Sequence, residues 1–182
     1  PVVGKKGELT QTEEIKIEVT FEKHMQSKIL KALFSNHVYE EVAYEIYALQ
    51  NTHQNIGLGM IGELENPMNE TEFLHFVKTK MQCGVIRHSE LLNKPIKKVA
   101  VLGGSGSFAI KNAIQSGADI FLTADLKYHD FYQSENQLVL ADIGHFESER
   151  YTKNYIVDFL KEKITNFAVV LSEENTNPVK YL

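Results

Sequence analysis

Hydrophobic residues after position 95 fall into short continuous runs, which are separated by stretches with helical spacing. The runs predict strands at 96–103, 119–125, 137–144 and 167–173. The intervening stretches predict helices at 107–117, 126–135 and 147–164. Apolar strands that alternate with helices are typical of a parallel sheet covered on both faces. The pattern therefore predicts an α/β fold, with a mostly parallel sheet flanked by helices.

The first fifty residues follow a different pattern. Residues 15–21 and 39–50 alternate apolar and polar positions with period two, which indicates half-buried strands. Between them, residues 22–37 place apolar side chains on one face of a helix. This order predicts a small α+β unit that precedes the α/β part.

The two patterns meet in a Gly- and Asn-rich stretch, 51–67, which is interpreted as a domain boundary. It contains "GLGMIG" (57–62), which matches a dinucleotide-binding pattern. That pattern needs a helix directly after it, whereas "ELENP" follows here, so we interpret these glycines as an extended connection. A helix is then predicted at 69–82, with Asn69 and Glu72 forming a start like a capping box.

Composition narrows the class of protein. The chain has 182 residues, 43% hydrophobic and 24% charged, which is typical of a globular protein. Its net charge of -5 argues against a nucleic-acid partner. Cys83 is the single cysteine, so no internal disulfide is possible. The longest apolar runs, such as 167–171, are too short to cross a bilayer, so we expect a cytoplasmic protein without a membrane partner.

The first candidate site is the turn "LGGSGS" (102–107), which follows a predicted strand. Strand-to-helix turns present free backbone N–H groups, which suits an anion, and Gly104, Ser105 and Gly106 are therefore candidate substrate-binding residues. The alternative is that the glycines permit a tight turn and that Ser105 or Ser107 caps the helix. The sequence leaves these two interpretations open.

The second candidate is "TADLKYHD" (123–130), at the end of the next predicted strand. Asp125 stands where a helix N-cap is expected, and His129 follows one helical turn later. Capping and surface exposure are the commonest roles of these residue types. Their position at a strand's carboxyl end also permits a role in a pocket.

The third candidate is "ADIGHFESE" (141–149), in which His145 and Glu149 lie four residues apart. On a helix this spacing places both side chains on one face, where they can chelate one divalent ion such as Zn, Mn or Fe. Two ligands do not complete a catalytic metal site, and the positive end of a helix disfavours a cation. Spacing alone favours the alternative interpretation, an acidic first turn of a helix.

Taken together, "GGSGS", "TADLKYHD" and "GHFESE" resemble, in order and spacing, the NIF-three-like family of type-two GTP cyclohydrolase I homologues. "NHVYEEVAYEIYALQN" (36–51) and "GLGMIGEL" (57–64) resemble further segments of that family. The resemblance implies two related α/β halves around a dinuclear divalent-metal site. It also implies that some members carry an inserted domain similar to PII and CutA proteins.

The resemblance assigns roles to four residues. It implies that His145 and Glu149 are the two metal ligands that the second half of the fold supplies. It places Asp125 and His129 beside the metal cleft as catalytic residues, with His129 able to shuttle a proton. The remaining ligands of the family are adjacent histidines and an aspartate in the first half, and this chain has no His-His pair.

By the same resemblance, residues 1–52 are part of a PII/CutA-like insert, and residues 53–182 are the C-terminal α/β half. We therefore expect half of a dinuclear site here, with about two divalent ions in each full-length subunit and poor binding by this chain alone. Apolar faces left uncovered in such a portion would favour a homo-oligomer.

Two functions follow as hypotheses. The first is a metal-dependent hydrolase of GTP cyclohydrolase type that acts on a nucleotide or another phosphorylated small molecule. The second is a non-enzymatic regulatory or scaffold protein, whose PII-like insert senses a small molecule or mediates assembly.

Overall fold

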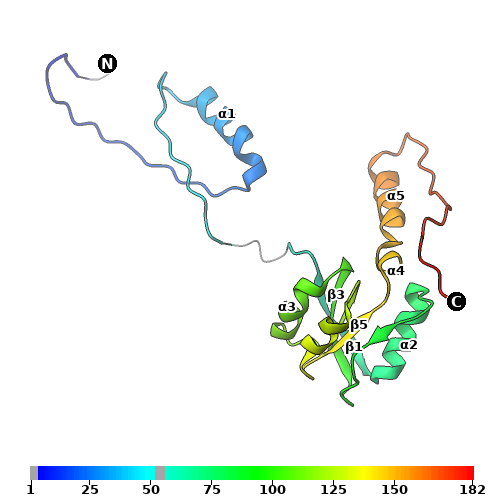
Figure 1. Ribbon diagram of the computed structural model, residues 1–182. Coiled ribbons are helices and arrows are strands. Elements are labelled where there is room, and N and C mark those ends of the chain that lie inside the picture. The colour runs from blue at the N-terminus through cyan, green and yellow to red at the C-terminus, as the bar shows by residue number, and fades with distance from the viewer. Residues whose placement is uncertain (1–3, 52–55) are drawn as a thin grey trace. The chain divides into compact units, whose positions relative to one another are not determined.

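The computed structural model describes residues 4–51 and 56–182. The chain divides into two compact units, Pro1–Thr52 and His53–Leu182 (Figure 1). Each unit is described separately below. Whether the first is part of a PII-like insert stays a prediction.

The first unit contains one helical region. A short 3₁₀ turn, η1 (Lys23–Met25), leads into α1 (Gln26–Asn36), so the predicted helix is confirmed. Within residues 4–51 there is no strand, and both strands predicted there are wrong. Ile15 and Ile17 are 91% and 82% exposed, because the extended segment that carries them pairs with no neighbouring strand. Alternation creates an apolar face, but a strand also needs a hydrogen-bonded neighbour.

The second unit is built on one five-stranded sheet with the order β1-β3-β4-β5-β2. Its strands are β1 (Met60–Met68), β2 (Arg87–His88), β3 (Ile96–Ser105), β4 (Ile120–Ala124) and β5 (Val139–Asp142). The central pairs β3–β4 and β4–β5 are parallel, whereas β1 and β2 pair antiparallel at the two edges. The sheet is therefore mixed, and the expected parallel arrangement is found only at its centre.

Strand β1 overlaps the stretch 51–67, which the sequence predicts to be a domain boundary. It contains Pro67 and exposes Met60 and Ile61, which is compatible with an edge strand but not with a central one. Its register against β3 shifts between Glu63 and Met68. The sequence did not predict this strand because it contains Gly and Pro. An edge strand tolerates both, since it needs neither a continuous apolar run nor a hydrogen bond from every backbone N–H group.

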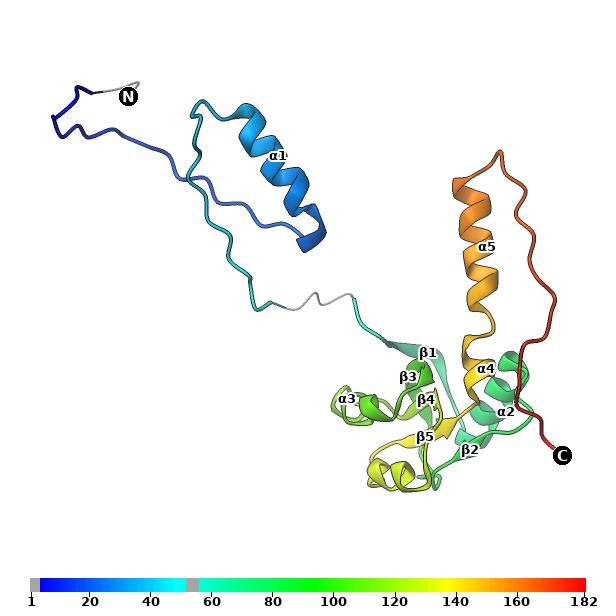
Figure 2. The same ribbon diagram turned by 45° about the horizontal axis from the view of Figure 1, so that its top comes forward.

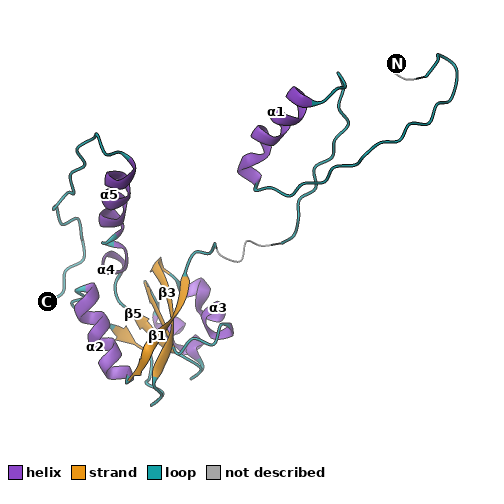
Figure 3. Ribbon diagram, turned by 180° about the vertical axis from the view of Figure 1, so that it is seen from behind, coloured by secondary structure: helices purple, strands orange, loops and turns teal. Residues whose placement is uncertain are grey.

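Helices cover both faces of the sheet, as Figures 2 and 3 show for α2 (Glu70–Met81) and α3 (Ile110–Gln115). On the face of α2, Phe73 and Val77 pack with Ile120 in one buried cluster. On the face of α3, Ile110 packs with Phe121 in a second cluster. Because successive residues of a strand point to opposite faces, β4 contributes to both clusters. Asn69 caps helix α2 as predicted, but its Oδ1 accepts the N–H of Thr71 at 2.9 Å rather than that of Glu72, which a capping box would use.

The C-terminal region departs furthest from the prediction. Two helices, α4 (His145–Glu149) and α5 (Thr152–Lys163), replace the single expected helix. Helix α5 buries none of its residues, and its apolar side chains Tyr155, Ile156 and Phe159 are exposed. Residues 167–173 form no strand, since they pair with none of the five. In the described part of the chain, no helix is long and apolar enough to cross a membrane.

Candidate functional site

The three candidate motifs meet at one end of the sheet, which is called the site edge below. They do so because they follow the carboxyl ends of the three adjacent parallel strands β3, β4 and β5. Ser105 closes β3 and lies opposite Ala124 of β4, while Thr123 lies opposite Asp142 of β5. Carboxyl ends of parallel strands share an edge, so Asp125 and His145 are brought to the same place. This edge is where α/β sheets commonly bind ligands.

At the centre of the edge, His145, Asp125 and Ser105 form a chain of hydrogen bonds. The Nδ1 atom of His145 lies 2.6 Å from Asp125 Oδ2, and Ser105 Oγ donates to the same carboxylate oxygen at 2.5 Å. The Ser105 hydroxyl and then His145 lower the pKa of Asp125. The hydrogen bond with Asp125 in turn raises the pKa of His145. The His145 and Asp125 side chains are about half exposed, so the pair faces solvent.

The opposite ring nitrogen of His145 faces Glu149. The Nε2 atom lies 3.3 Å from Glu149 Oε2, one turn further along α4. The expected i, i+4 pair is therefore present, on a helix that begins at His145 rather than at residue 147. Asp125 and Glu149 hold the imidazole between two carboxylates.

Gly104 lets the end of β3 approach this pair closely. Its φ is +68°, and a Cβ atom there would lie 2.6 Å from Glu149 Oε1. Its N–H donates to Ser148 Oγ at 2.8 Å, and its carbonyl accepts the Thr123 hydroxyl at 3.1 Å. These two hydrogen bonds attach the turn at Gly104 to α4 and to β4.

This geometry bears on the two interpretations of the turn. The helical segment that follows, η2 (Ser107–Ala109), has Gly106 as its N-cap residue and no side-chain cap, so neither Ser105 nor Ser107 caps it. Ser105 bonds to Asp125 instead. Anion binding by Gly104, Ser105 and Gly106 stays a prediction.

His129 is placed differently from Asp125. Asp125 lies in a turn with φ +57° rather than at a helix N-cap, and the following 3₁₀ segment η3 (Tyr128–Ser134) begins after Lys127. The exposed ring of His129 lies edge-on to Tyr128, with centroids 5.2 Å apart. Among the residues that the structure describes, no hydrogen bond joins His129 to Asp125 or His145. The partner of Asp125 is His145.

Ser148 and Thr123 also shape the edge, although sequence reasoning missed both. Ser148 Oγ accepts the N–H of Gly104 and donates to the carbonyl of His145 at 2.8 Å. Thr123 is fully buried, and a Cβ atom on Gly106 would lie 2.0 Å from its Oγ1. A polar residue inside the apolar β4 sequence was the available signal for Thr123.

The metal prediction can be compared with the donors present. His145 Nε2 and Glu149 Oε2 are the donor types that Zn, Mn or Fe accepts, and they lie close together. Over residues 4–51 and 56–182, no group of three or more His, Cys, Asp and Glu side chains is arranged to hold one ion. The two donors fit part of a metal site, and they do not complete one.

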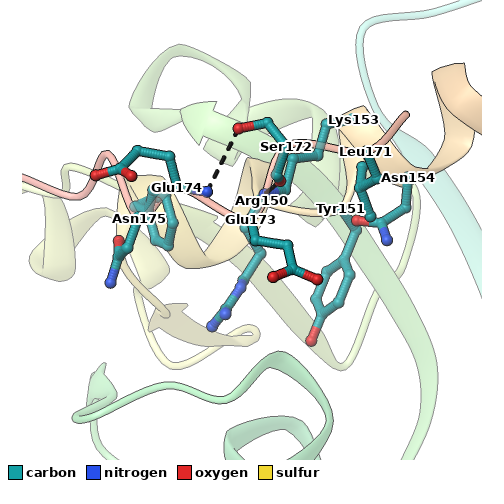
Figure 4. Close-up of a pocket in the computed structure, with 10 residues that line it drawn as sticks. Arg150, Tyr151, Lys153, Asn154, Leu171, Ser172, Glu173, Glu174 and Asn175 are labelled. Carbon is teal, nitrogen blue, oxygen red and sulfur yellow. Dashed lines mark hydrogen bonds between the residues drawn. The ribbon is translucent and has the colours of Figure 1, made fainter. Parts of the chain in front are cut away.

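A separate hollow of about 290 Å³ lies where α4 and α5 meet residues 171–175 (Figure 4). Arg150 lines it, with its guanidinium 5.4 Å from the centre of the Phe146 ring. The hollow includes none of the predicted site residues. It is therefore distinct from the edge around His145.

The fold and this edge define an α/β protein with a mixed sheet, whose polar side chains gather at the carboxyl ends of parallel strands. The sequence model of the Duf34/NIF3 (NGG1p interacting factor 3) family matches residues 4–178. The chain belongs to this family.

Known relatives agree with that membership. A Bacillus subtilis (strain 168) protein named GTP cyclohydrolase 1 type 2 homolog is 35% identical over 187 residues, which cover 100% of this chain and 50% of the relative. The chain thus spans about half the length of the curated relatives it matches.

Two solved structures are similar to most of this chain. A Staphylococcus aureus protein matches with a TM-score of 0.73 and 28% identity, over 91% of this chain and 55% of that one. A Bacillus cereus protein described as related to NIF3 matches with a TM-score of 0.69 and 32% identity, over 87% of this chain and 45% of that one.

Proposed function

We propose that this Duf34/NIF3 protein binds divalent metal ions, Zn, Mn or Fe, through His145 and Glu149. One observation carries the proposal: both carboxylates that flank His145 are in contact with its ring, one at each nitrogen. A metal-bound histidine commonly donates its second N–H group to a carboxylate, which fixes the ring. Asp125 supplies that carboxylate, so Nε2 and Glu149 are left to face the ion.

The proposed site needs further ligands. Three protein ligands are usual for a catalytic metal, and His145 and Glu149 are two. The relatives are about twice as long as this chain, so the proposal places the other ligands in further sequence and expects about two ions in each full-length subunit. Residues 1–52 belong, on this proposal, to a PII-like insert, and 53–182 to the half that carries His145.

The proposed activity is hydrolysis of a nucleotide or another phosphorylated heterocycle, in keeping with the name that the relatives carry. A divalent ion in such a site lowers the pKa of a bound water and so supplies a nucleophile at neutral pH. In this scheme Asp125 orients the imidazole of His145. Gly104, Ser105 and Gly106 lie beside the substrate, and the exposed imidazole of His129 carries protons.

Elemental analysis of the full-length protein tests the metal assignment. We expect His145→Ala and Glu149→Ala each to lower the bound metal substantially. His75→Ala is the matched control, since His75 is an exposed histidine on α2 and belongs to none of the three site motifs. Wild-type metal content in both site variants would refute the assignment.

A second candidate is a regulatory or scaffold protein that assembles into a homo-oligomer through its first unit. Ile15, Ile17 and Val19 support it, because they alternate along one extended segment and are exposed. Light scattering of wild type and of Ile17→Thr tests it. A monomeric wild-type protein would count against assembly.

A further inference from the structure

Asp142, the last residue of β5, contacts both segments that carry the central pair of the site. Its side chain is 5% exposed. Oδ2 accepts the N–H of Leu126 at 2.9 Å, and Oδ1 accepts the N–H of Gly144 at 3.1 Å. Leu126 directly follows Asp125, and Gly144 directly precedes His145. One buried carboxylate therefore lies between the backbones of the two residues that form the 2.6 Å contact.

Both of these backbone segments need an external acceptor. The chain turns at Asp125, where φ is +57°, and at Gly144, where φ is +92°. Strand β4 ends at Ala124 and β5 ends at Asp142, so the N–H groups of Leu126 and Gly144 lie beyond the strand pairing. Leu126 is buried, and a buried N–H group without an acceptor is costly. A non-glycine residue with positive φ persists only where its surroundings hold it. Asp142 supplies the acceptor in both cases.

Arg87, on the edge strand β2, also contacts Asp142 and Leu126. It lies opposite Asp142 in the β2–β5 register. One of its guanidinium nitrogens, Nη2, donates to Asp142 Oδ2 and also to the carbonyl of Leu126, the latter at 2.9 Å. A buried carboxylate is stable only with such compensation, and the guanidinium provides it. Arg87 and Asp142 together hold Leu126 by its N–H and by its carbonyl.

We propose that Asp142 is the positioning residue of this site, and that it brings Asp125 Oδ2 within hydrogen-bonding distance of His145 Nδ1. Asp142 has no contact with the ring of His145 and acts through the two backbone segments. The proposal deepens the proposed function and rests on it only for the consequence for metal binding. The geometric claim concerns the ring of His145 and holds for the metal-free chain.

The test uses the 182-residue chain without metal. Long-range ¹H–¹⁵N NMR of histidine rings reports which ring nitrogen carries the proton in the neutral form. We expect His145 of the wild type to be protonated mainly on Nδ1, because the contact of Nδ1 with Asp125 Oδ2, at 2.6 Å, is much shorter than the contact of Nε2 with Glu149 Oε2, at 3.3 Å. In Asp142→Asn one of the two N–H groups loses its acceptor, and we expect the His145 ring to change to mainly Nε2-protonated.

Glu70→Gln is the matched control. Glu70 is also a buried carboxylate, 3% exposed, and accepts two loop N–H groups, from Leu92 at 2.7 Å and from Asn93 at 3.0 Å. It has no contact with the site. We expect this variant to lose stability while His145 keeps its wild-type ring signature.

Arg87→Lys is the milder variant, for the case in which Asp142→Asn does not fold. A lysine cannot donate to Asp142 and to the Leu126 carbonyl with the same planar geometry, so we expect a partial change at His145. A wild-type ring signature in a folded Asp142→Asn or in Arg87→Lys overturns the proposal. An equal change in Glu70→Gln also overturns it, because the effect would then reflect general destabilisation.

The consequence for metal binding is tested separately in the full-length protein. There Asp142→Asn is expected to weaken metal binding by about 10- to 100-fold, the range typical of residues that orient a ligand. If His145→Ala leaves metal binding unchanged, the proposed function fails while the NMR result stands. If His145→Ala removes the metal and Asp142→Asn binds it like wild type, the positioning role is refuted.

Discussion

His145 Nδ1 and Asp125 Oδ2 lie 2.6 Å apart, although 20 positions separate the two residues. The pKa of Asp125 is lowered, so its carboxylate is ionised at neutral pH and can only accept a hydrogen bond. The proton of this contact therefore belongs to Nδ1, which leaves Nε2 as the nitrogen that faces Glu149. The contact fixes one orientation of the ring, with Nδ1 towards Asp125 and Nε2 towards Glu149.

Gly104→Ala is expected to disturb Glu149 and to lower the free energy of unfolding. The alanine would adopt a positive φ, which costs ~1 kcal/mol, and its Cβ would also displace the Glu149 carboxylate. Gly117→Ala is the control, since Gly117 has φ +71° and no atom within 4 Å of its Cβ position. Urea unfolding should show a larger loss for Gly104→Ala. Equal losses would mean that Glu149 moves aside freely.

Ser105→Ala is expected to raise the pKa of Asp125 towards the ordinary value, because the Ser105 hydroxyl is the main cause of its lowering. A carboxyl group whose pKa is lower in the folded state stabilises the fold above its ordinary pKa, near 4. That contribution disappears as the pH falls through the lowered value. The variant should therefore lose it at a higher pH than wild type. A ¹³C NMR titration of the Asp125 carboxyl, with Ser107→Ala as control, checks the shift.

Ser148→Ala is expected to destabilise the unit by about 1 kcal/mol, because it removes an acceptor for Gly104 N–H and a donor to the His145 carbonyl. Denaturant unfolding measures the loss. Thr71→Ala serves as the comparison, since the Thr71 backbone N–H bonds to Asn69 without help from its side chain. A Ser148→Ala variant as stable as Thr71→Ala would show that the link contributes nothing.

Cys83 is expected to react slowly with thiol reagents while the protein is folded. Burial raises the pKa of its thiol to about 11, and Glu147 adds to the effect. At pH 8 the thiolate is then only about 0.1% of the total, and the thiolate is the reactive form. We expect the reaction to accelerate strongly in urea. Rapid reaction in native buffer, followed by absorbance, would contradict the burial of Cys83.

The sequence by itself determined the central strands and the α2 start. Runs that are apolar throughout, such as the one at β4, have few alternatives to a buried strand, and Asn69 needs only local contacts to cap a helix. The i, i+4 spacing likewise placed Glu149 beside His145, because one turn of helix decides that contact.

Only the tertiary structure decided the remaining relationships. Pairing across a sheet decided that Asp125 contacts His145 rather than His129, and that Asp142 bonds both neighbouring segments. Residues 15–21 also show the effect of tertiary structure. Their apolar and polar residues alternate as in a strand, but they form no strand because no neighbouring strand pairs with them. Local patterns depend on neighbours along the chain, whereas these contacts depend on which strands lie side by side.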